Sequence, residues 1–292
     1  MVNLFIAGFS KCGTTSLFNS LINHKDIGCG TSKEPSYFSK LNGFTNTKNY
    51  DDWSVGGNYF RGINWYDEIF KNRTNNIKYK IDASTIYSFD SDSPRLIHNY
   101  NPNSKIIFIV REPYKRIESH YFQEVKNGMK LPKFDKFIVS EHPRLNFYKK
   151  VTNYKSTILR YIDIFGNNNV YVTSLNEIKD NPEVVFSEIL NFLKIEEYDF
   201  NQLLKRESKN MRKSPRFRYL KSLFIGIERS KLARHSPRFV QEFGSSIMRH
   251  LDRLLLKEID NKIKISENIR NEINDEFKED TDYLKNIHNI SI

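Results

Sequence analysis

The sequence predicts a three-layer α/β domain, in which helices cover both faces of a mainly parallel sheet. Short apolar runs of β-type composition alternate with segments of helical spacing over the first two thirds of the chain. One run, Lys105–Val110, is continuously apolar after its first residue, as is typical of a strand buried on both faces. The 292 residues include 22 Phe and 16 Tyr, which supply enough apolar surface for a sizeable core.

The elements can be placed in order along the chain. Residues 4–8 are predicted to form the first strand, and residues 14–23 the helix that follows it. Further strands are expected at 79–82, 105–110 and 170–173, and further helices at 113–126, at 146–165 and from Pro182 onward. Proline favours the first turn of a helix, and a glycine such as Gly166 commonly ends one.

Beyond about residue 205 the pattern becomes that of amphipathic helices. Apolar residues recur at helical spacing within 217–227 and within 240–255. A final helix is expected from about Ser266 to Leu284. The last third is therefore predicted to be helical and to cap the sheet.

One domain is expected over 1–292, because no repeat or linker-like stretch interrupts the chain. It divides into an α/β core (1–204) and a helical, basic extension (205–292). The formal net charge is +11, and the segment 205–253 alone holds 14 Lys and Arg against four acidic residues. We interpret this segment as a solvated helical face. A peripheral contact with anionic lipid or an acidic acceptor is the sharper alternative.

Composition also bears on compartment and cofactors. Two cysteines, Cys12 and Cys29, exclude a disulfide scaffold and suit a reducing compartment. No run of about 18 apolar residues could span a membrane, and no signal peptide is apparent. We therefore expect a cytoplasmic protein, peripheral at a membrane if the basic segment binds lipid. The seven His and two Cys show no metal-ligand spacing, so no metal is expected.

The segment from Gly8 to Ser16 follows the first strand and opens a helix. Such a loop directs backbone N–H groups and a helix N-terminus at an anion. Its two glycines match the G-x-x-x-x-G spacing of the P-loop. However, Thr14 stands where the Walker lysine is required, and Lys11 lies inside the loop, which disfavours a Mg-nucleotide triphosphatase. Alternatively, the segment binds no ligand and is a tight turn followed by a helix that begins with hydroxyl side chains.

A second anion site is predicted at the end of the 105–110 strand. Arg111 lies at its carboxyl end, where ligands bind in open α/β sheets. Its guanidinium can hold a phosphate in a bidentate fork, and Ser119 can add a hydroxyl donor from the following helix. The alternative is a surface arginine beside a solvated Glu112–Arg116 pair.

These motifs resemble those of the PAPS-dependent sulfotransferases, where PAPS is 3′-phosphoadenosine 5′-phosphosulfate. The K-x-G-T-T-S-L that begins at Lys11 resembles their 5′-phosphosulfate loop, and R-x-P-x-x-R-x-x-S-x-Y from Arg111 resembles their 3′-phosphate motif. Residues 33–38, Lys-Glu-Pro-Ser-Tyr-Phe, are similar to the K-E-P-x-F-F of the heparan-sulfate and bacterial carbohydrate branch. The resemblance spans nearly the whole chain and implies a P-loop-NTPase-like sheet.

The resemblance also implies roles for individual residues. The 5′-phosphate site would consist of Lys11, Cys12, Gly13, Thr14, Thr15 and Ser16. Arg111 and Ser119 would hold the 3′-phosphate, and Arg212 is a further basic candidate. Glu34 would be the general base and Lys11 would stabilise charge on the leaving group. Without the resemblance, Glu34 would be interpreted as the partner of a nearby Lys or Arg.

Two segments extend the resemblance, and one of them departs from it. Residues 61–66 are similar to the family's G-x-x-W-Y, and residues 82–87 to its E-K-S-P-x-Y. In the second, Ala83 replaces a lysine that assists the reaction in the heparan-sulfate enzymes, and Thr85 replaces the proline. No catalytic lysine is therefore assigned at position 83, and a strict heparan-type acceptor is disfavoured.

The expected function is transfer of a sulfuryl group from PAPS to a hydroxyl or amine of a carbohydrate or glycolipid, releasing adenosine 3′,5′-bisphosphate (PAP). Two other classes stay open: a P-loop nucleotide kinase-like phosphotransferase, and a non-catalytic basic module for nucleic acid or membranes. No specific nucleic-acid partner is expected. His120, beside Ser119, is interpreted as structural.

Overall fold

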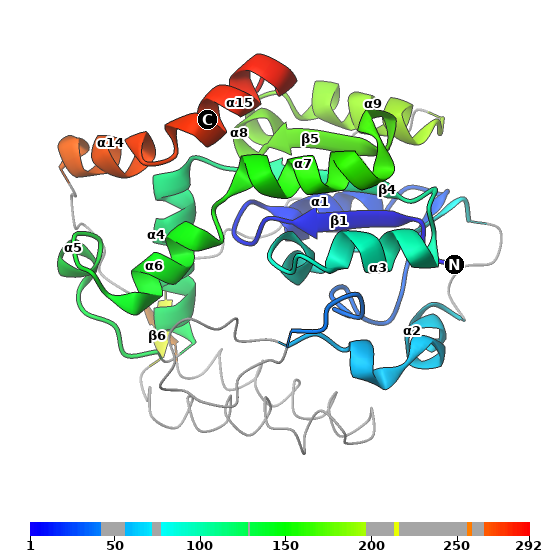
Figure 1. Ribbon diagram of the computed structural model, residues 1–292, viewed down its shortest axis with the longest axis horizontal. Coiled ribbons are helices and arrows are strands. Elements are labelled where there is room, and N and C mark those ends of the chain that lie inside the picture. The colour runs from blue at the N-terminus through cyan, green and yellow to red at the C-terminus, as the bar shows by residue number, and fades with distance from the viewer. Residues whose placement is uncertain (42–55, 72–76, 128, 197–212, 216–255, 259–265) are drawn as a thin grey trace.

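The centre of the fold is a five-stranded, wholly parallel sheet (Figure 1). The computed structural model describes residues 1–41, 56–71, 77–127, 129–196, 213–215, 256–258 and 266–292. In spatial order the strands are Ile27–Cys29 (β2), Tyr79–Asp82 (β3), Leu4–Gly8 (β1), Lys105–Val110 (β4) and Val170–Ser174 (β5). The four predicted strands are confirmed. The edge strand β2 was not predicted, because three residues carry too little pattern.

Helices cover both faces of the sheet, as predicted. In Figure 1, α3 and α7 lie together in front of the strands, and α1 lies behind β1. The helices up to residue 193 are Thr14–Leu21 (α1), Ile63–Phe70 (α2), Ser93–Tyr100 (α3), Pro113–Lys126 (α4), Phe134–Phe137 (α5), Pro143–Lys150 (α6), Tyr154–Phe165 (α7), Leu175–Asp180 (α8) and Pro182–Leu193 (α9). Single 3-10 turns occur at Tyr59–Arg61 (η1), Thr85–Ser88 (η2) and Asn167–Asn169 (η3).

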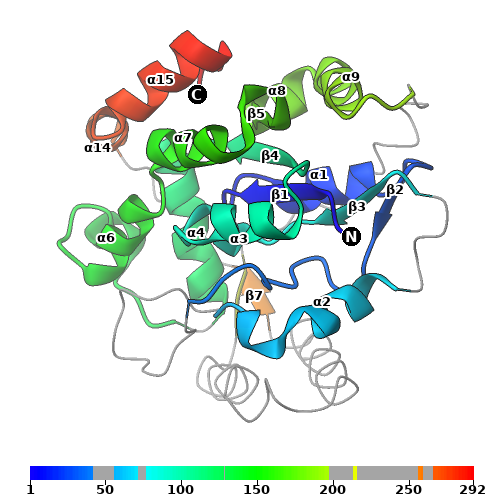
Figure 2. The same cartoon turned by 45° about the vertical axis from the view of Figure 1, so that its right-hand side comes forward.

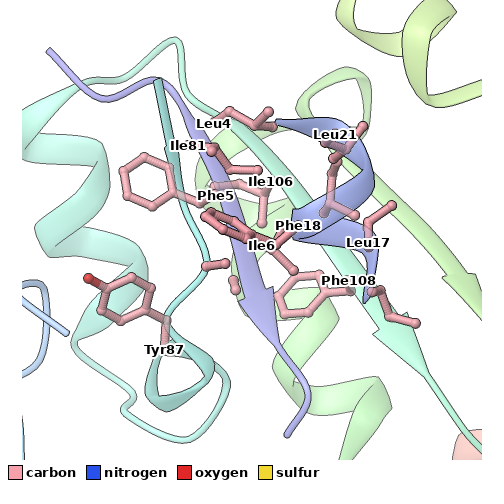
Figure 3. Close-up of a cluster of buried hydrophobic side chains, with 14 of the residues drawn as sticks. Leu4, Phe5, Ile6, Leu17, Phe18, Leu21, Ile81, Tyr87, Ile106 and Phe108 are labelled. Carbon is pink, nitrogen blue, oxygen red and sulfur yellow. The ribbon is translucent and has the colours of Figure 1, made fainter. Parts of the chain in front are cut away.

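The core lies on both sides of β1 and β4. Every residue of β1 is buried, as are all residues of β4 after Lys105. Figure 3 shows Leu17, Phe18 and Leu21 of α1 on one side of β1 and Tyr87 on the other. Because β1 and β4 are parallel neighbours, their carboxyl ends meet at the same edge of the sheet.

The helix predicted over 146–165 is wrong in extent, because the structure has two helices there. α6 ends at Lys150 and α7 begins at Tyr154. Asn153 caps α7, since its side-chain oxygen accepts hydrogen bonds from the backbone N and the hydroxyl of Ser156 at 3.2 and 2.6 Å. An asparagine side chain that binds the first-turn N–H groups favours a helix start over helix continuation.

The C-terminal residues are helical where the structure describes them, apart from one short strand pair. The predicted final helix is two helices, Glu267–Asp275 (α14) and Lys278–His288 (α15), which meet at the buried Phe277. α14 contacts α4 and α15 contacts α7 (Figure 2). Lys213–Pro215 (β6) and Leu256–Glu258 (β7) form an antiparallel pair that the sequence did not predict.

Several predictions fall outside the described residues. These are both amphipathic stripes, at 217–227 and 240–255, and nearly all of the basic segment 205–253. The division at residue 204 therefore stays a prediction. Within the described ranges, no helix is long and apolar enough to cross a membrane.

Candidate functional site

The loop from Gly8 to Ser16, here called the phosphate loop, joins β1 to α1 at the carboxyl edge of the sheet. Gly13 has φ +95°, and a Cβ at this position would lie 2.6 Å from Leu175 Cδ1. The backbone conformation therefore favours glycine here, and a larger residue would also displace the end of the Leu175 side chain. Thr15 and Ser16 are exposed at the start of α1, whose first-turn N–H groups have no acceptor within the helix. The loop thus presents donors at its open side.

A buried arginine supports the rear of the phosphate loop. Arg116 of α4 is 1% exposed and donates from Nε to the Ser10 carbonyl (3.0 Å) and from Nη2 to the Ser10 hydroxyl (3.2 Å). Its third donor, Nη1, binds the Thr152 hydroxyl. The alternative of a solvated Glu112–Arg116 pair is therefore wrong. Arg116 is part of the core and holds the loop from behind.

Cys12 is also turned toward the interior. Its thiol is fully buried, 3.7 Å from the Ser10 carbonyl and 4.0 Å from the Tyr154 hydroxyl. Burial raises the pKa of the Cys12 thiol. The side chain faces away from the open side of the loop, so a ligand there would meet only its backbone.

Positive charge converges on the phosphate loop from two elements. Arg111, directly after β4, donates from Nη1 to the Lys11 carbonyl at 3.1 Å. Lys11 Nζ donates to Gln123 Oε1 of α4 at 3.2 Å. Burial, and then the charges of Lys126 and Arg111, lower the pKa of Lys11 to about 8. A lysine held beside two further cations suits a polyanionic ligand, because a bound anion would relieve their repulsion.

Glu34 lies on the exposed side of the same site. Lys33 Nζ contacts Glu34 Oε1 at 2.6 Å, and the Thr85 hydroxyl donates to Glu34 Oε2 at 3.2 Å. The charge of Glu34 also acts on Lys11, whose pKa it raises in part. The Lys33–Glu34 ion pair is the one expected if Glu34 has no catalytic role. It occurs, however, within reach of the charge cluster around the phosphate loop.

Glu112 is bound from the C-terminal helices. Arg270 of α14 forms a bidentate pair with its two carboxylate oxygens, at 2.6 and 2.7 Å, and Asn274 Nδ2 donates to Oε1 at 3.0 Å. These donors lower the pKa of Glu112 against the opposing effect of burial. The acid next to Arg111 is thereby neutralised locally.

A profile of the sulfotransferase domain family matches residues 2–264 of the chain. The chain belongs to the sulfotransferase family. The match confirms the predicted family and enzyme class.

Curated relatives of this sulfotransferase are heparan sulfate enzymes by name. Mouse heparan sulfate glucosamine 3-O-sulfotransferase 6 is 29% identical over 129 residues, which cover 44% of this chain and 32% of that protein. Mouse bifunctional heparan sulfate N-deacetylase/N-sulfotransferase 4 is 23% identical over 224 residues, covering 68% of this chain and 23% of that protein. The aligned chain thus spans less than a third of either relative.

Among solved structures, a sulfotransferase from Alicyclobacillus acidocaldarius has the same fold. It superposes with a TM-score of 0.60 at 25% identity, covering 83% of this chain and 99% of that one. The predicted P-loop-NTPase-like α/β fold class is confirmed by this likeness and by the parallel sheet.

Two residues beside Lys11 in this sulfotransferase were not among those predicted from the sequence. Gln123 binds Lys11, and Lys126 adds positive charge beside it. Gln123 is four residues after the predicted Ser119 in α4, and Lys126 is three residues after Gln123. This spacing places the three on one face of the helix. That spacing was a readable signal. Arg212, by contrast, lies outside the described residues, so its role stays a prediction.

His120 was correctly set aside as a structural residue. Its ring is buried and stacks on Tyr148, with the ring centroids 4.5 Å apart and an interplanar angle of 11°. Burial lowers the pKa of His120 well below its usual value, so the ring is neutral near pH 7.

Proposed function

We propose that this sulfotransferase domain transfers the sulfuryl group of PAPS to a hydroxyl or amine of a carbohydrate or glycolipid acceptor and releases PAP. The observation that carries the proposal is the hydrogen bond from Arg111 to the Lys11 carbonyl. It joins two anion-binding motifs 100 residues apart at one edge of the sheet. PAP carries phosphates at both ends of its ribose, which matches two adjacent cationic sites.

On the donor side, Lys11 and the N–H groups of residues 13–16 would hold the 5′-phosphate. Arg111 and Ser119 would hold the 3′-phosphate, and Lys126 adds charge to the same region. The set of donors suits this ligand, because Lys11 is held beside Lys126 and Arg111 at a pKa lowered to about 8. A phosphate bound there would favour the protonated lysine.

On the acceptor side, Glu34 would accept the proton. The acceptor oxygen or nitrogen forms a bond to sulfur while the bond from sulfur to the bridging phosphate oxygen breaks, and the acceptor proton passes to Glu34. Lys11 and the helix N-terminus oppose the negative charge that grows on the bridging oxygen. Ala83, fully buried, has no side-chain amine to contribute.

The acceptor is proposed to be a carbohydrate, because the curated relatives carry heparan sulfate in their names. The loss of a lysine at position 83 favours an acceptor outside the strict heparan type. Peripheral binding of anionic lipid through 205–253 is retained as a proposal, together with a cytoplasmic location.

Ligand selectivity tests the donor side. Thermal shift with PAP and with ATP, each with and without Mg²⁺, should show a PAP-selective and metal-independent rise in Tm. Selectivity for ATP with Mg²⁺ would favour the nucleotide kinase-like alternative, which the Thr14 position disfavours. If neither PAP nor ATP raises the Tm, a non-catalytic module would be favoured.

Substitution of Glu34 tests the acceptor side. Glu34→Gln should lower the rate of ³⁵S transfer from labelled PAPS by about 10²–10⁴-fold while PAP binding stays unchanged. Glu68→Gln is a matched control, because Glu68 is also an exposed glutamate paired with a lysine, Lys71, at 3.3 Å. Retained turnover in Glu34→Gln would exclude Glu34 as the base.

A further inference from the structure

The turn that follows β3 lies against the segment that carries Glu34. Here the turn, residues 82–85, is called the β3 corner. The backbone N of Ala83 donates to the Lys33 carbonyl at 3.0 Å. The Ser84 hydroxyl accepts from the backbone N of Ser36 at 2.9 Å. The Thr85 hydroxyl contacts Glu34 itself. Three consecutive residues of the corner thus bind Glu34 and the backbone before and after it.

The β3 corner is built on a buried carboxylate. Asp82 is 0% exposed and accepts four hydrogen bonds, two on each oxygen. Oδ1 accepts from the Ser84 backbone N (3.0 Å) and hydroxyl (2.6 Å). Oδ2 accepts from the hydroxyls of Tyr66 (2.9 Å) and Tyr87 (2.8 Å). All four lone-pair positions of the carboxylate are thus in use.

The carboxylate sets the direction of the two hydroxyls that reach the Glu34 segment. Each hydroxyl has one proton, and Ser84 and Tyr87 both give theirs to Asp82. Their lone pairs therefore face outward. The Ser84 hydroxyl accepts the Ser36 N–H, and the Tyr87 hydroxyl accepts the Phe38 N–H at 3.3 Å. An acceptor-only group in the core thereby orders the backbone two and four residues after Glu34.

We propose that Asp82 is a positioning residue for proton transfer, acting through the Ser84 and Tyr87 hydroxyls to hold the Glu34 carboxylate in place. This inference rests on the proposed function, in which Glu34 accepts the proton. The support differs on the two sides of the site: Asp82 supports the acceptor side, and Arg116 supports the phosphate loop on the donor side.

The protonation state of Asp82 gives the arrangement a pH dependence. Burial raises the pKa of Asp82 to about 6, against the opposing effect of its hydrogen bonds. The titratable groups facing it are Tyr66 of α2, Tyr87 of η2, Tyr100 of α3 and Tyr161 of α7. Burial raises the pKa of each tyrosine, so all four are neutral near pH 6.

The sign follows from the hydrogen bonds. Below about pH 6 one Asp82 oxygen carries a proton while two donors still face it. That proton displaces one of the donors, and where the donor is the Ser84 or Tyr87 hydroxyl, the hydroxyl must turn its own proton and its hydrogen bond from the Ser36 or Phe38 N–H is weakened. Asp82 thus supports the reaction above its pKa and ceases to do so below it.

The test uses Asp82→Asn, which keeps the size of the side chain but places an NH₂ group against two donors. We expect kcat for ³⁵S transfer from labelled PAPS, measured with whichever member of a panel of desulfated glycosaminoglycans and glycolipids the wild type labels best, to fall about 10²-fold, as for a misplaced catalytic group. The Kd of PAP should stay within about twofold, since it reports the donor side. The decline of kcat near pH 6 should disappear in the variant.

A double variant separates positioning from general stability. If Asp82 acts through Glu34, Asp82→Asn should have little further effect in a Glu34→Gln background. Equal losses in both backgrounds would overturn the proposal, as would an unchanged kcat in the single variant. Should Asp82→Asn fail to give a PAP-dependent thermal shift, Ser84→Ala takes its place. Ser104→Ala is its control, because the Ser104 hydroxyl, also buried, binds the Asn101 carbonyl at 2.7 Å before β4.

Amide hydrogen exchange tests the same inference without an acceptor. Asp82→Asn should increase exchange at Ser36 and Phe38 and leave the phosphate loop unchanged. Unchanged exchange at both amides would overturn the positioning role. If the wild-type chain transfers no ³⁵S to any acceptor of the panel, the proposed acceptor is wrong. If it does not bind PAP, the proposed function is wrong.

Discussion

The phosphate loop and the Glu34 segment lie at the same edge of the sheet but are held in different ways. The loop takes its shape from glycine conformation and from Arg116, a cation whose donors all point into the core. The Glu34 segment takes its order from Asp82, an anion that only accepts. Behind the loop, the buried cation Arg116 binds carbonyl and hydroxyl oxygens. Behind Glu34, the buried anion Asp82 binds hydroxyl and amide donors.

Because the supports differ, the two sides of the site should be impaired separately by substitution. Damage to the loop support should abolish donor binding, whereas damage to the β3 corner should lower turnover with the donor still bound. Four predictions on the donor side test this separation.

The largest effect is expected at the support of the phosphate loop. Arg116→Met leaves the Ser10 carbonyl and hydroxyl without their donor in the core. The free energy of unfolding should fall by about 3 kcal/mol, and PAP binding should be lost. Urea unfolding and calorimetric PAP titration measure the two effects. Arg95→Met, at an exposed position of α3, is the control; PAP affinity retained in Arg116→Met would contradict the role given to Arg116.

The next effect is expected at the lysine inside the loop. Lys11→Met should raise the Kd of PAP by about 10- to 100-fold, because a hydrogen bond between charged groups is lost. The fold should be retained, since removal of the lysine also removes repulsion from Lys126 and Arg111. Lys25→Met is the control, at an exposed lysine that pairs with Glu196. A Kd within twofold of wild type would place the 5′-phosphate elsewhere.

The pH dependence of PAP binding should be smaller and should have a defined sign. Because the pKa of Lys11 in the free protein is lowered to about 8, the ammonium form is lost as pH rises through 8. PAP affinity should therefore fall above pH 8 in the wild type and not in Lys11→Met. Without ligand, the unfolded chain binds the proton more tightly than the folded one, so this lysine makes stability rise between pH 8 and its unfolded pKa. Affinity that is flat through pH 8 would contradict the assignment.

The smallest effect is expected where α14 binds the acid next to Arg111. Arg270→Met should lower the free energy of unfolding by less than about 1 kcal/mol, because its side chain is 43% exposed. The Kd of PAP should rise by less than about threefold, as the released Glu112 carboxylate competes for nearby cations. Lys278→Met, in an exposed pair with Asp282, is the control. A tenfold loss of PAP affinity would make α14 part of the donor site itself.

Much of the site was predictable because its signals are local. The glycine spacing of the phosphate loop, the apolar run before Arg111 and the proline at the start of α4 each lie within a few residues. The Ser119, Gln123 and Lys126 face was readable from helical spacing alone. The break between α6 and α7 had a weaker signal, Asn153 three residues before Ser156, which competed with continuous apolar spacing.

Four of the five strands of the parallel sheet, the loop after β1 and the resemblance to the family could be predicted from the sequence alone, because periodicity and motif spacing are properties of neighbouring residues. The contacts of Arg116 with Ser10, of Glu112 with Arg270, and of the β3 corner with the Glu34 segment are seen only in the folded chain. These pairs are separated by dozens to more than a hundred residues, and each needs burial to exclude water as the competing partner. A charged residue reads alike in sequence whether it is solvated or buried, so its role emerges only when packing selects its partners.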